Sequence, residues 1–162
     1  MVRHAGLIAS RGEVLDLACG SGRHARYLAG LGHAVHAVDR DAAAIAGLQG
    51  VSGITAEQRD LEGEAWPLAG RSYAGIVVTN YLWRPRLPDL LALLALGGVL
   101  IYETFMLGNQ AYGKPSRPAF LLQPGELRQI AAAAGLREID FVEGYVEAPK
   151  PAMRQAICAL RV

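Results

Sequence analysis

The chain has 162 residues and nearly balanced charge, with 16 Lys and Arg against 15 Asp and Glu. This length predicts a single domain over residues 1–162, with a core large enough to be stable without disulfides. The balanced charge disfavours a polynucleotide partner, which usually requires a basic stripe, and no apolar run is long enough to span a membrane. Two cysteines without metal-ligand spacing and the lack of a signal-peptide pattern predict a cytoplasmic protein with reduced thiols.

The first informative segment covers residues 13–24, where an apolar strand pattern meets a glycine turn. Asp16 lies near the end of this predicted strand, Gly20 and Gly22 interrupt it, and a helical pattern follows over residues 23–31. A strand, a glycine turn and a helix N-terminus are typical of a nucleotide-type site at the edge of a parallel sheet. A buried carboxylate beside the turn favours a cationic ligand over a phosphate, because it offers a charge-assisted contact.

Residues 16–22, which read D-L-A-C-G-S-G, resemble the glycine-rich first motif of class I S-adenosylmethionine-dependent methyltransferases. The resemblance is closest to the small, single-domain type related to tellurite-resistance methylases. In that family the glycine loop packs against the methionine part of the cofactor, and the acid near the first strand's end faces its ammonium group. The resemblance therefore implies cofactor contacts at Asp16, Ala18, Gly20 and Gly22.

A second buried strand is predicted over residues 34–39, and it ends in Asp39. Asp39 lies nineteen positions beyond Gly20, which matches the rule that an acid about 20 residues after the glycine turn binds ribose hydroxyls. The alternative role is to cap the next helix, but Asp41 is better placed to do so before residues 42–48. We therefore expect Asp39 to contact ribose.

A shorter third strand is predicted over residues 54–58, and a loop over residues 62–72 follows it. Asp60 and Leu61 lie between the two. In the resembled family an acidic residue and an apolar residue after the third strand hold the adenine. The resemblance implies this role for Asp60 and Leu61, although an isolated aspartate in a loop is more often solvated or capping.

The fourth predicted strand, residues 73–80, places Asn80, Tyr81 and Trp83 at or just beyond its carboxyl end. Ligands of open α/β sheets bind outside such ends, so we expect these residues to face the transferred group, with Asn80 also beside the cofactor. The aromatic pair suits a flat or cationic acceptor, and half-buried packing is an equally open interpretation. The Asn-Pro-Pro-aromatic motif of aminomethylating relatives is not present, so N-methylation of a base is not supported.

The remaining elements complete an alternating β and α pattern. A helix is predicted over residues 89–96, a fifth strand over 99–105 and another helix over 124–134. Two strands, 136–145 and 153–161, follow, and the resemblance implies that they form a terminal antiparallel hairpin. The predicted fold class is α/β: a Rossmann-like, doubly wound, mostly parallel seven-stranded sheet with helices on both faces.

A long loop over residues 106–123 is predicted to cover the acceptor pocket. Residues 108–114 spell most of a phosphate-binding P-loop, but Pro115 supplies neither the hydroxyl nor the amide that this motif needs, so we reject it. The loop's polar candidates for acceptor contacts are Asn109, Tyr112, Lys114 and Arg117.

The predicted function is in-line transfer of a methyl group from S-adenosylmethionine to a small-molecule acceptor. Positioning the reactants and excluding water supply most of the rate, so no general base is assigned. The acceptor-side candidates share a place at the carboxyl ends of the fourth and fifth strands: Asn80, Tyr81, Trp83 and Glu103. No His, Cys, Asp and Glu set has metal-ligand spacing, the acceptor atom is open, and no oligomeric state is indicated.

Two alternatives remain. Residues 20–25 fit the G-x-G-x-x-A fingerprint of NAD(P)-binding oxidoreductases, and Asp39 would serve that ribose equally well. Asp16 beside the turn, the lack of a Tyr-x-x-x-Lys pair and the short chain argue against an oxidoreductase. The other alternative is a non-catalytic module that binds S-adenosylmethionine.

Overall fold

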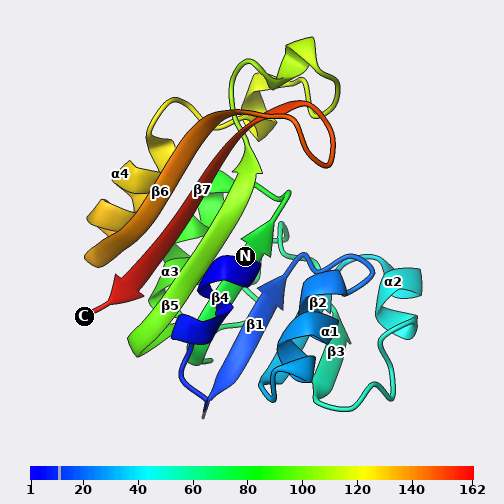
Figure 1. The fold of residues 1–162 in the computed structure, drawn as a ribbon. Coiled ribbons are helices and arrows are strands. Elements are labelled where there is room, and N and C mark those ends of the chain that lie inside the picture. Colours follow the sequence, from blue (N-terminus) through cyan, green and yellow to red (C-terminus); the bar gives the residue numbers. More distant parts are fainter. Residues whose placement is uncertain (11) are drawn as a thin grey trace.

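The computed structural model describes residues 1–10 and 12–162, which form a seven-stranded sheet in the order β3-β2-β1-β4-β5-β7-β6 (Figure 1). The strands are β1 (Glu13–Leu17), β2 (Ala34–Asp39), β3 (Ile54–Gln58), β4 (Tyr73–Thr79), β5 (Leu94–Phe105), β6 (Leu136–Val146) and β7 (Ala152–Arg161). The first five run parallel, and β7 pairs antiparallel with both β5 and β6. This arrangement confirms the predicted Rossmann-like fold with its terminal hairpin.

Helices cover both faces of the sheet. The α-helices are α1 (Arg23–Gly30), α2 (Ala42–Ala46), α3 (Leu87–Ala92) and α4 (Glu126–Ala133), and the 3-10 turns are η1 (Val2–Leu7), η2 (Arg84–Arg86), η3 (Asn109–Ala111) and η4 (Pro118–Phe120). In Figure 1, η1 and α1 lie in front of the sheet, and α3 and α4 lie behind it. None of the helices in the described residues is long and apolar enough to cross a membrane.

Alternating side chains divide the core into two layers. Val14 of β1 packs on the front face in one cluster with Ile8 and Leu28, whereas Leu15 belongs to the rear cluster with Leu90 of α3. This alternation is the two-residue period of a β-strand whose two faces are both buried. The sheet order reverses between β1 and β4, which places the topological switch point at the carboxyl ends of these strands.

The region after α3 differs from the prediction. The helix expected over 89–96 ends at Ala92, and β5 already begins at Leu94. The cause is a long-range pairing, because Leu94 is the partner of Tyr73, and the next pair of the ladder is Gly75 with Val99. The residues between these two pairs bulge out of the ladder and leave Leu96 83% exposed. Leu94 and Leu96, where the spacing of leucines predicted a helix, thus belong to β5.

Candidate functional site

The turn after β1 has an unusual backbone. Ala18, Gly20 and Gly22 have φ angles of 54°, 54° and 78°, in the left-handed region that favours glycine. A Cβ on Gly22 would lie 2.4 Å from a methyl carbon of Leu48, so both the space and the angle require glycine there. Ala18 adopts the same region with a side chain, and this type of backbone strain is concentrated at functional sites.

Asp39 holds this turn in place. Its Oδ2 accepts a hydrogen bond from the Gly20 amide at 2.8 Å, and its Oδ1 accepts one from the Asp41 amide at 2.9 Å. Each carboxylate oxygen still has a second lone pair for a ligand hydroxyl. Asp41, as expected, caps α2 by accepting from the Ala43 and Ala44 amides. The ribose contact of Asp39 stays a prediction, now joined by an observed role in positioning the glycine turn.

Asp16 is a buried carboxyl group close to the first turn of α1. It is 1% exposed, and among residues 1–10 and 12–162 no donor meets hydrogen-bond geometry to either of its oxygens, although the Ala25 amide lies close enough to affect its pKa. Burial raises the pKa of Asp16 from 3.8 to about 7; the Asp39 carboxylate adds to this, and the Ala25 amide and Arg23 partly offset it. A carboxylate in this state is stabilised by a cationic partner.

A cavity of about 240 Å³ opens at the carboxyl ends of β1, β2 and β4. Five of the eight predicted cofactor residues line it: Ala18, Asp39, Asp60, Leu61 and Asn80. Asp16, Gly20 and Gly22 do not line it. Arg40, Glu62 and Tyr81 complete the lining. Arg40 and Glu62 were not predicted, although each directly follows a predicted residue along the chain.

A second cavity, of about 310 Å³, adjoins the first at Asn80. We call it the 310 Å³ cavity. Its lining comes from η1, α1 and the ends of β4, β5 and β7, and consists of Met1, Val2, Arg23, His24, Tyr27, Thr79, Asn80, Glu103 and Arg154. Asn80 has a φ of 56°, a conformation that is rare for a residue with a side chain. Two predicted acceptor-side residues, Asn80 and Glu103, therefore lie together here.

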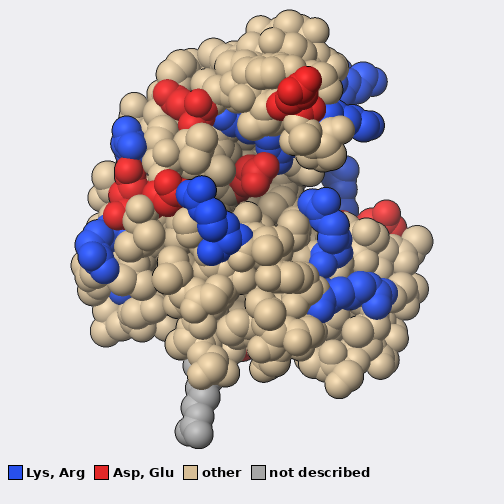
Figure 2. All heavy atoms as spheres, in the orientation of Figure 1, with Lys and Arg blue, Asp and Glu red and all other residues tan. Residues whose placement is uncertain are grey.

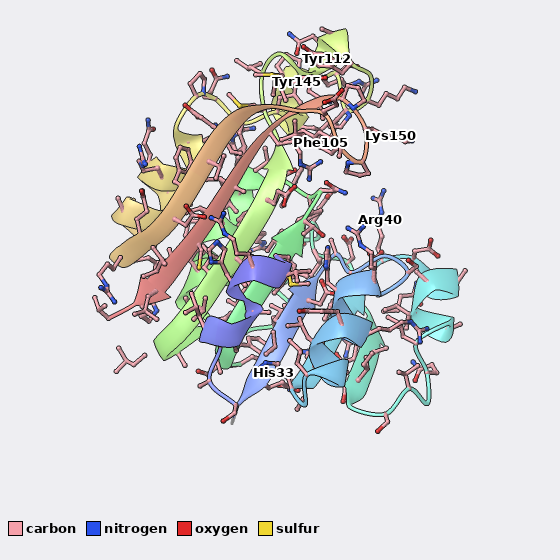
Figure 3. The ribbon with its side chains drawn as sticks, in the orientation of Figure 1. His33, Arg40, Phe105, Tyr112, Tyr145 and Lys150 are labelled. Carbon is pink, nitrogen blue, oxygen red and sulfur yellow. The ribbon has the colours of Figure 1, made fainter. Side chains whose placement is uncertain are left out.

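Arg154 is another cavity residue that the sequence analysis did not single out. It forms an ion pair with Glu103 at 2.6 Å, donates to the Asn80 side-chain oxygen and lies 4.4 Å from the Phe105 ring centre. Figure 3 shows Phe105 at the end of β5 and Arg40 just after β2, both at the carboxyl edge of the sheet. The only sequence signal for Arg154 is a basic residue within an otherwise largely apolar last strand.

The two predicted aromatic residues have different surroundings. Tyr81 lines the 240 Å³ cavity, its hydroxyl has no hydrogen-bond partner in the described part of the chain, and burial raises its pKa above the usual range. Trp83 lines a separate small cavity with Trp66, Leu87 and other core residues. Two residues of that small cavity, Leu61 and Tyr81, also line the 240 Å³ cavity, and Trp83 is half-buried, so its place facing the transferred group stays a prediction.

Two reactive groups near the turn are poorly suited to act as nucleophile or acid. Burial, together with the Asp16 and Asp39 carboxylates, raises the pKa of Cys19 to about 12, so its thiol stays protonated. Burial also lowers the pKa of His24, so its imidazole is neutral at pH 7. Across the described ranges, no group of three or more His, Cys, Asp and Glu residues could hold a metal ion.

The loop over 106–123 does not place its polar candidates at either cavity. Asn109 is buried, accepts from the Met153 amide at 3.1 Å and donates to the Pro115 carbonyl at 3.0 Å, so its role is structural. The Tyr112 ring packs beside Tyr145 (Figure 3). Neither Asn109, Tyr112, Lys114 nor Arg117 lines the two cavities. The P-loop-like segment is followed by η4 and does not lead directly into an α-helix, since α4 begins only at Glu126, in agreement with its rejection.

Comparison with known proteins places the chain. No curated protein matches the sequence. The structure superimposes on TehB from Haemophilus influenzae with a TM-score of 0.81 and 22% identity, and covers 99% of this chain but 61% of that one. A TehB-like SAM-dependent methyltransferase from Corynebacterium glutamicum matches with a TM-score of 0.69 and 21% identity, over 98% of this chain and 87% of that one. A SAM-dependent methyltransferase from Aquifex aeolicus matches with a TM-score of 0.71 and 19% identity, over 99% of this chain and 87% of that one. A family model described as a methyltransferase domain matches residues 14–96, so the chain belongs to that family and has the class I fold that its first motif resembles.

Proposed function

We propose that the chain transfers a methyl group from S-adenosylmethionine, the cofactor that its family and fold imply, to a small-molecule acceptor. The observation that carries this proposal is the meeting of two cavities at Asn80. One is lined by residues whose types suit an adenosyl group. The other, about 310 Å³, has the size of a site for a small molecule.

The residues of the first cavity fit the cofactor. The Asp39 carboxylate keeps lone pairs for ribose hydroxyls after binding two backbone amides. Asp60 and Leu61, side by side in the lining, offer an acceptor for an exocyclic amine and an apolar surface for a purine ring. Asp16 does not line this cavity but lies buried beneath the glycine turn, where it would supply the negative charge that an ammonium group needs.

Catalysis in this proposal depends on alignment. Bound cofactor supplies a methyl group on a sulfonium, which is already a good leaving group. The chain's own contribution is to hold the acceptor in line through Asn80 and the Glu103–Arg154 pair, and to exclude water with the partly buried Tyr81. Orientation of this kind can contribute about 7–11 kcal/mol to lowering a barrier, so no proton-transfer group is required.

The test is calorimetric titration with S-adenosylhomocysteine, with NAD titrated in parallel. We expect S-adenosylhomocysteine to bind and Asp39→Ala to abolish binding. Asp41→Ala is the matched control, because it removes a carboxylate two positions away that caps α2 and does not line the cavity. Binding of NAD alone would overturn the methyltransferase proposal in favour of an oxidoreductase.

A further inference from the structure

The loop that follows β3 carries two of the predicted cofactor residues and has no regular structure. Asp60 and Leu61 line the 240 Å³ cavity, yet residues 60–65 belong to no helix or strand. Within the described residues, no backbone–backbone hydrogen bond involves residues 60–65. The Glu62 amide donates to Oδ1 of Asp60 at 2.9 Å, which closes a turn inside the loop. Apart from the packing of the buried Leu61, the position of this loop therefore depends on side chains from other segments.

Arg86 supplies that connection. It lies at the end of η2, and its Nη2 donates to the Gly63 carbonyl at 3.0 Å and to the Glu64 carbonyl. Its Nη1 donates at 3.0 Å to Oδ2 of Asp89 in the first turn of α3, and its guanidinium carbon lies 5.9 Å from the Trp66 ring centre. Many Lys and Arg side chains project from the surface in Figure 2, whereas the side chain of Arg86 is 24% exposed. Arg86 thus joins the loop after β3 to the segment that follows β4.

The connection reaches the carboxylate of Asp60. The turn with Glu62 uses Oδ1, so Oδ2 remains for a ligand. A Cβ on Gly63 would lie 3.2 Å from this Oδ2, so the Gly63 backbone packs directly against the oxygen that faces a ligand. Arg86 holds Gly63 by its carbonyl. Without that hydrogen bond, Gly63 could move, and the Asp60 carboxylate would lose its fixed orientation at the cavity.

Arg86 acts from behind the cavity wall. It does not line the 240 Å³ cavity, but it lines the adjoining small cavity together with Leu61 and Tyr81, which line both. Its planar guanidinium carries five N–H donors in a fixed fork, so one side chain can bind two carbonyls and a carboxylate at the same time. Its contribution to ligand binding is therefore indirect, through the position of the residues in front of it.

We propose that Arg86 is a positioning residue for base recognition: it fixes the Asp60 carboxylate so that the site prefers adenine to a purine with an oxo group in place of the exocyclic amine. This inference rests on the proposed function, in which Asp60 accepts from that amine. Hypoxanthine presents an oxygen acceptor at the same position, and two acceptors that face each other form no hydrogen bond. A fixed Asp60 therefore discriminates between the two bases, and a mobile one turns away from the unfavourable contact.

The experiment is calorimetric titration of the full chain with S-adenosylhomocysteine and with S-inosylhomocysteine, in which hypoxanthine replaces adenine. Wild type should bind S-adenosylhomocysteine at least about tenfold more tightly than the inosyl compound. Arg86→Leu should weaken S-adenosylhomocysteine binding about tenfold and S-inosylhomocysteine binding less than about twofold, so the ratio of the two affinities falls to about one. A loss of folding stability alone would weaken both ligands equally, so this ratio separates positioning from a structural role.

The matched control is Arg84→Leu. It removes a guanidinium two positions earlier that also donates to loop carbonyls, those of Ala119 and Leu121. That loop carries none of the predicted cofactor residues, so Arg84→Leu should keep the wild-type ratio of affinities. An equal fall of the ratio in Arg84→Leu and Arg86→Leu would overturn the specific role of Arg86.

Arg86→Lys is a second variant that decides the question if Arg86→Leu does not fold, because it keeps the positive charge and most of the apolar stem. A single ammonium lacks the planar fork that reaches two carbonyls and Asp89, so the ratio should fall at least about threefold. A wild-type ratio in the folded Arg86 variants, or a ratio of about one in wild type, would overturn the positioning role and leave the methyltransferase proposal intact. Failure of wild type to bind S-adenosylhomocysteine would overturn the proposed function itself.

Discussion

Replacing Asp16 by Asn should stabilise the unliganded protein at alkaline pH. Burial raises the pKa of Asp16 from 3.8 to about 7, so the folded state binds this proton more tightly than the unfolded state does. The stability contributed by the group is therefore present at low pH and is lost as pH rises from 3.8 to about 7. At about 1.4 kcal/mol per pH unit, the raised pKa lowers the unfolding free energy by about 2 kcal/mol at pH 5, where folding requires the carboxyl to take up a proton. At pH 8, where the buried carboxyl is charged, the loss is about 4 kcal/mol.

The assay is urea unfolding without ligand at both pH values. Asp16→Asn carries no charge at either pH, so its gain over wild type should be about 2 kcal/mol larger at pH 8 than at pH 5. The control is Glu64→Gln, which removes an exposed carboxyl with no desolvation to relieve. The same Asp16→Asn variant should bind S-adenosylhomocysteine more weakly. A pH-independent difference between Asp16→Asn and wild type would refute the argument from burial.

Three further predictions concern packing and hydrogen bonds. Gly22→Ala should cost about 1–3 kcal/mol in unfolding free energy, because its Cβ would meet Leu48 and its φ is positive; an unchanged urea midpoint would contradict this. His36→Leu should lower the unfolding free energy by about 1–3 kcal/mol, because it leaves the buried Tyr73 hydroxyl, 2.6 Å from Nδ1, without its partner. In a double-mutant cycle, adding Tyr73→Phe should recover part of this loss. Arg84→Leu should free the 106–123 loop, since its guanidinium donates to the carbonyls of two loop residues, and increase proteolysis there without lowering cofactor affinity.

The sheet was predictable because its signals are local. Residues 34–39 and 54–58 are strands with the expected bounds, since apolar runs end there at an acid or a polar turn. The end of α3 was not predictable in this way, because Leu93 and Leu94 fit the helical and the strand period equally well. The pairing of Leu94 with Tyr73, twenty-one positions earlier, decides between them, and a single sequence does not display it.

Some residues of the candidate site were likewise predictable from local signals, and others were not. Residues that follow the strand ends, such as Asp39 and Asn80, could be placed at one edge from the topology of a parallel sheet alone. Arg154 could not, because its position depends on antiparallel register with Phe105, which brings a residue near the end of the chain beside the fourth strand. Trp83 lines a small cavity beside the 240 Å³ one, with which it shares Leu61 and Tyr81, and its acceptor-side role stays a prediction.

The predicted cofactor residues and the hairpin lie in different parts of the chain. Every predicted cofactor residue, from Asp16 to Asn80, lies within the segment 14–96 that matches the methyltransferase family, whereas Glu103 and the hairpin lie outside it. A cofactor of fixed chemistry needs the same carboxylates and glycines in the same places, but an acceptor is selected by the shape and charge of its own surface. Substitutions on β6 and β7 should therefore change which acceptor is methylated while cofactor affinity is retained. We expect the hairpin to influence the choice of acceptor, because it supplies Arg154 to the 310 Å³ cavity, whereas none of the eight predicted cofactor residues lies on it.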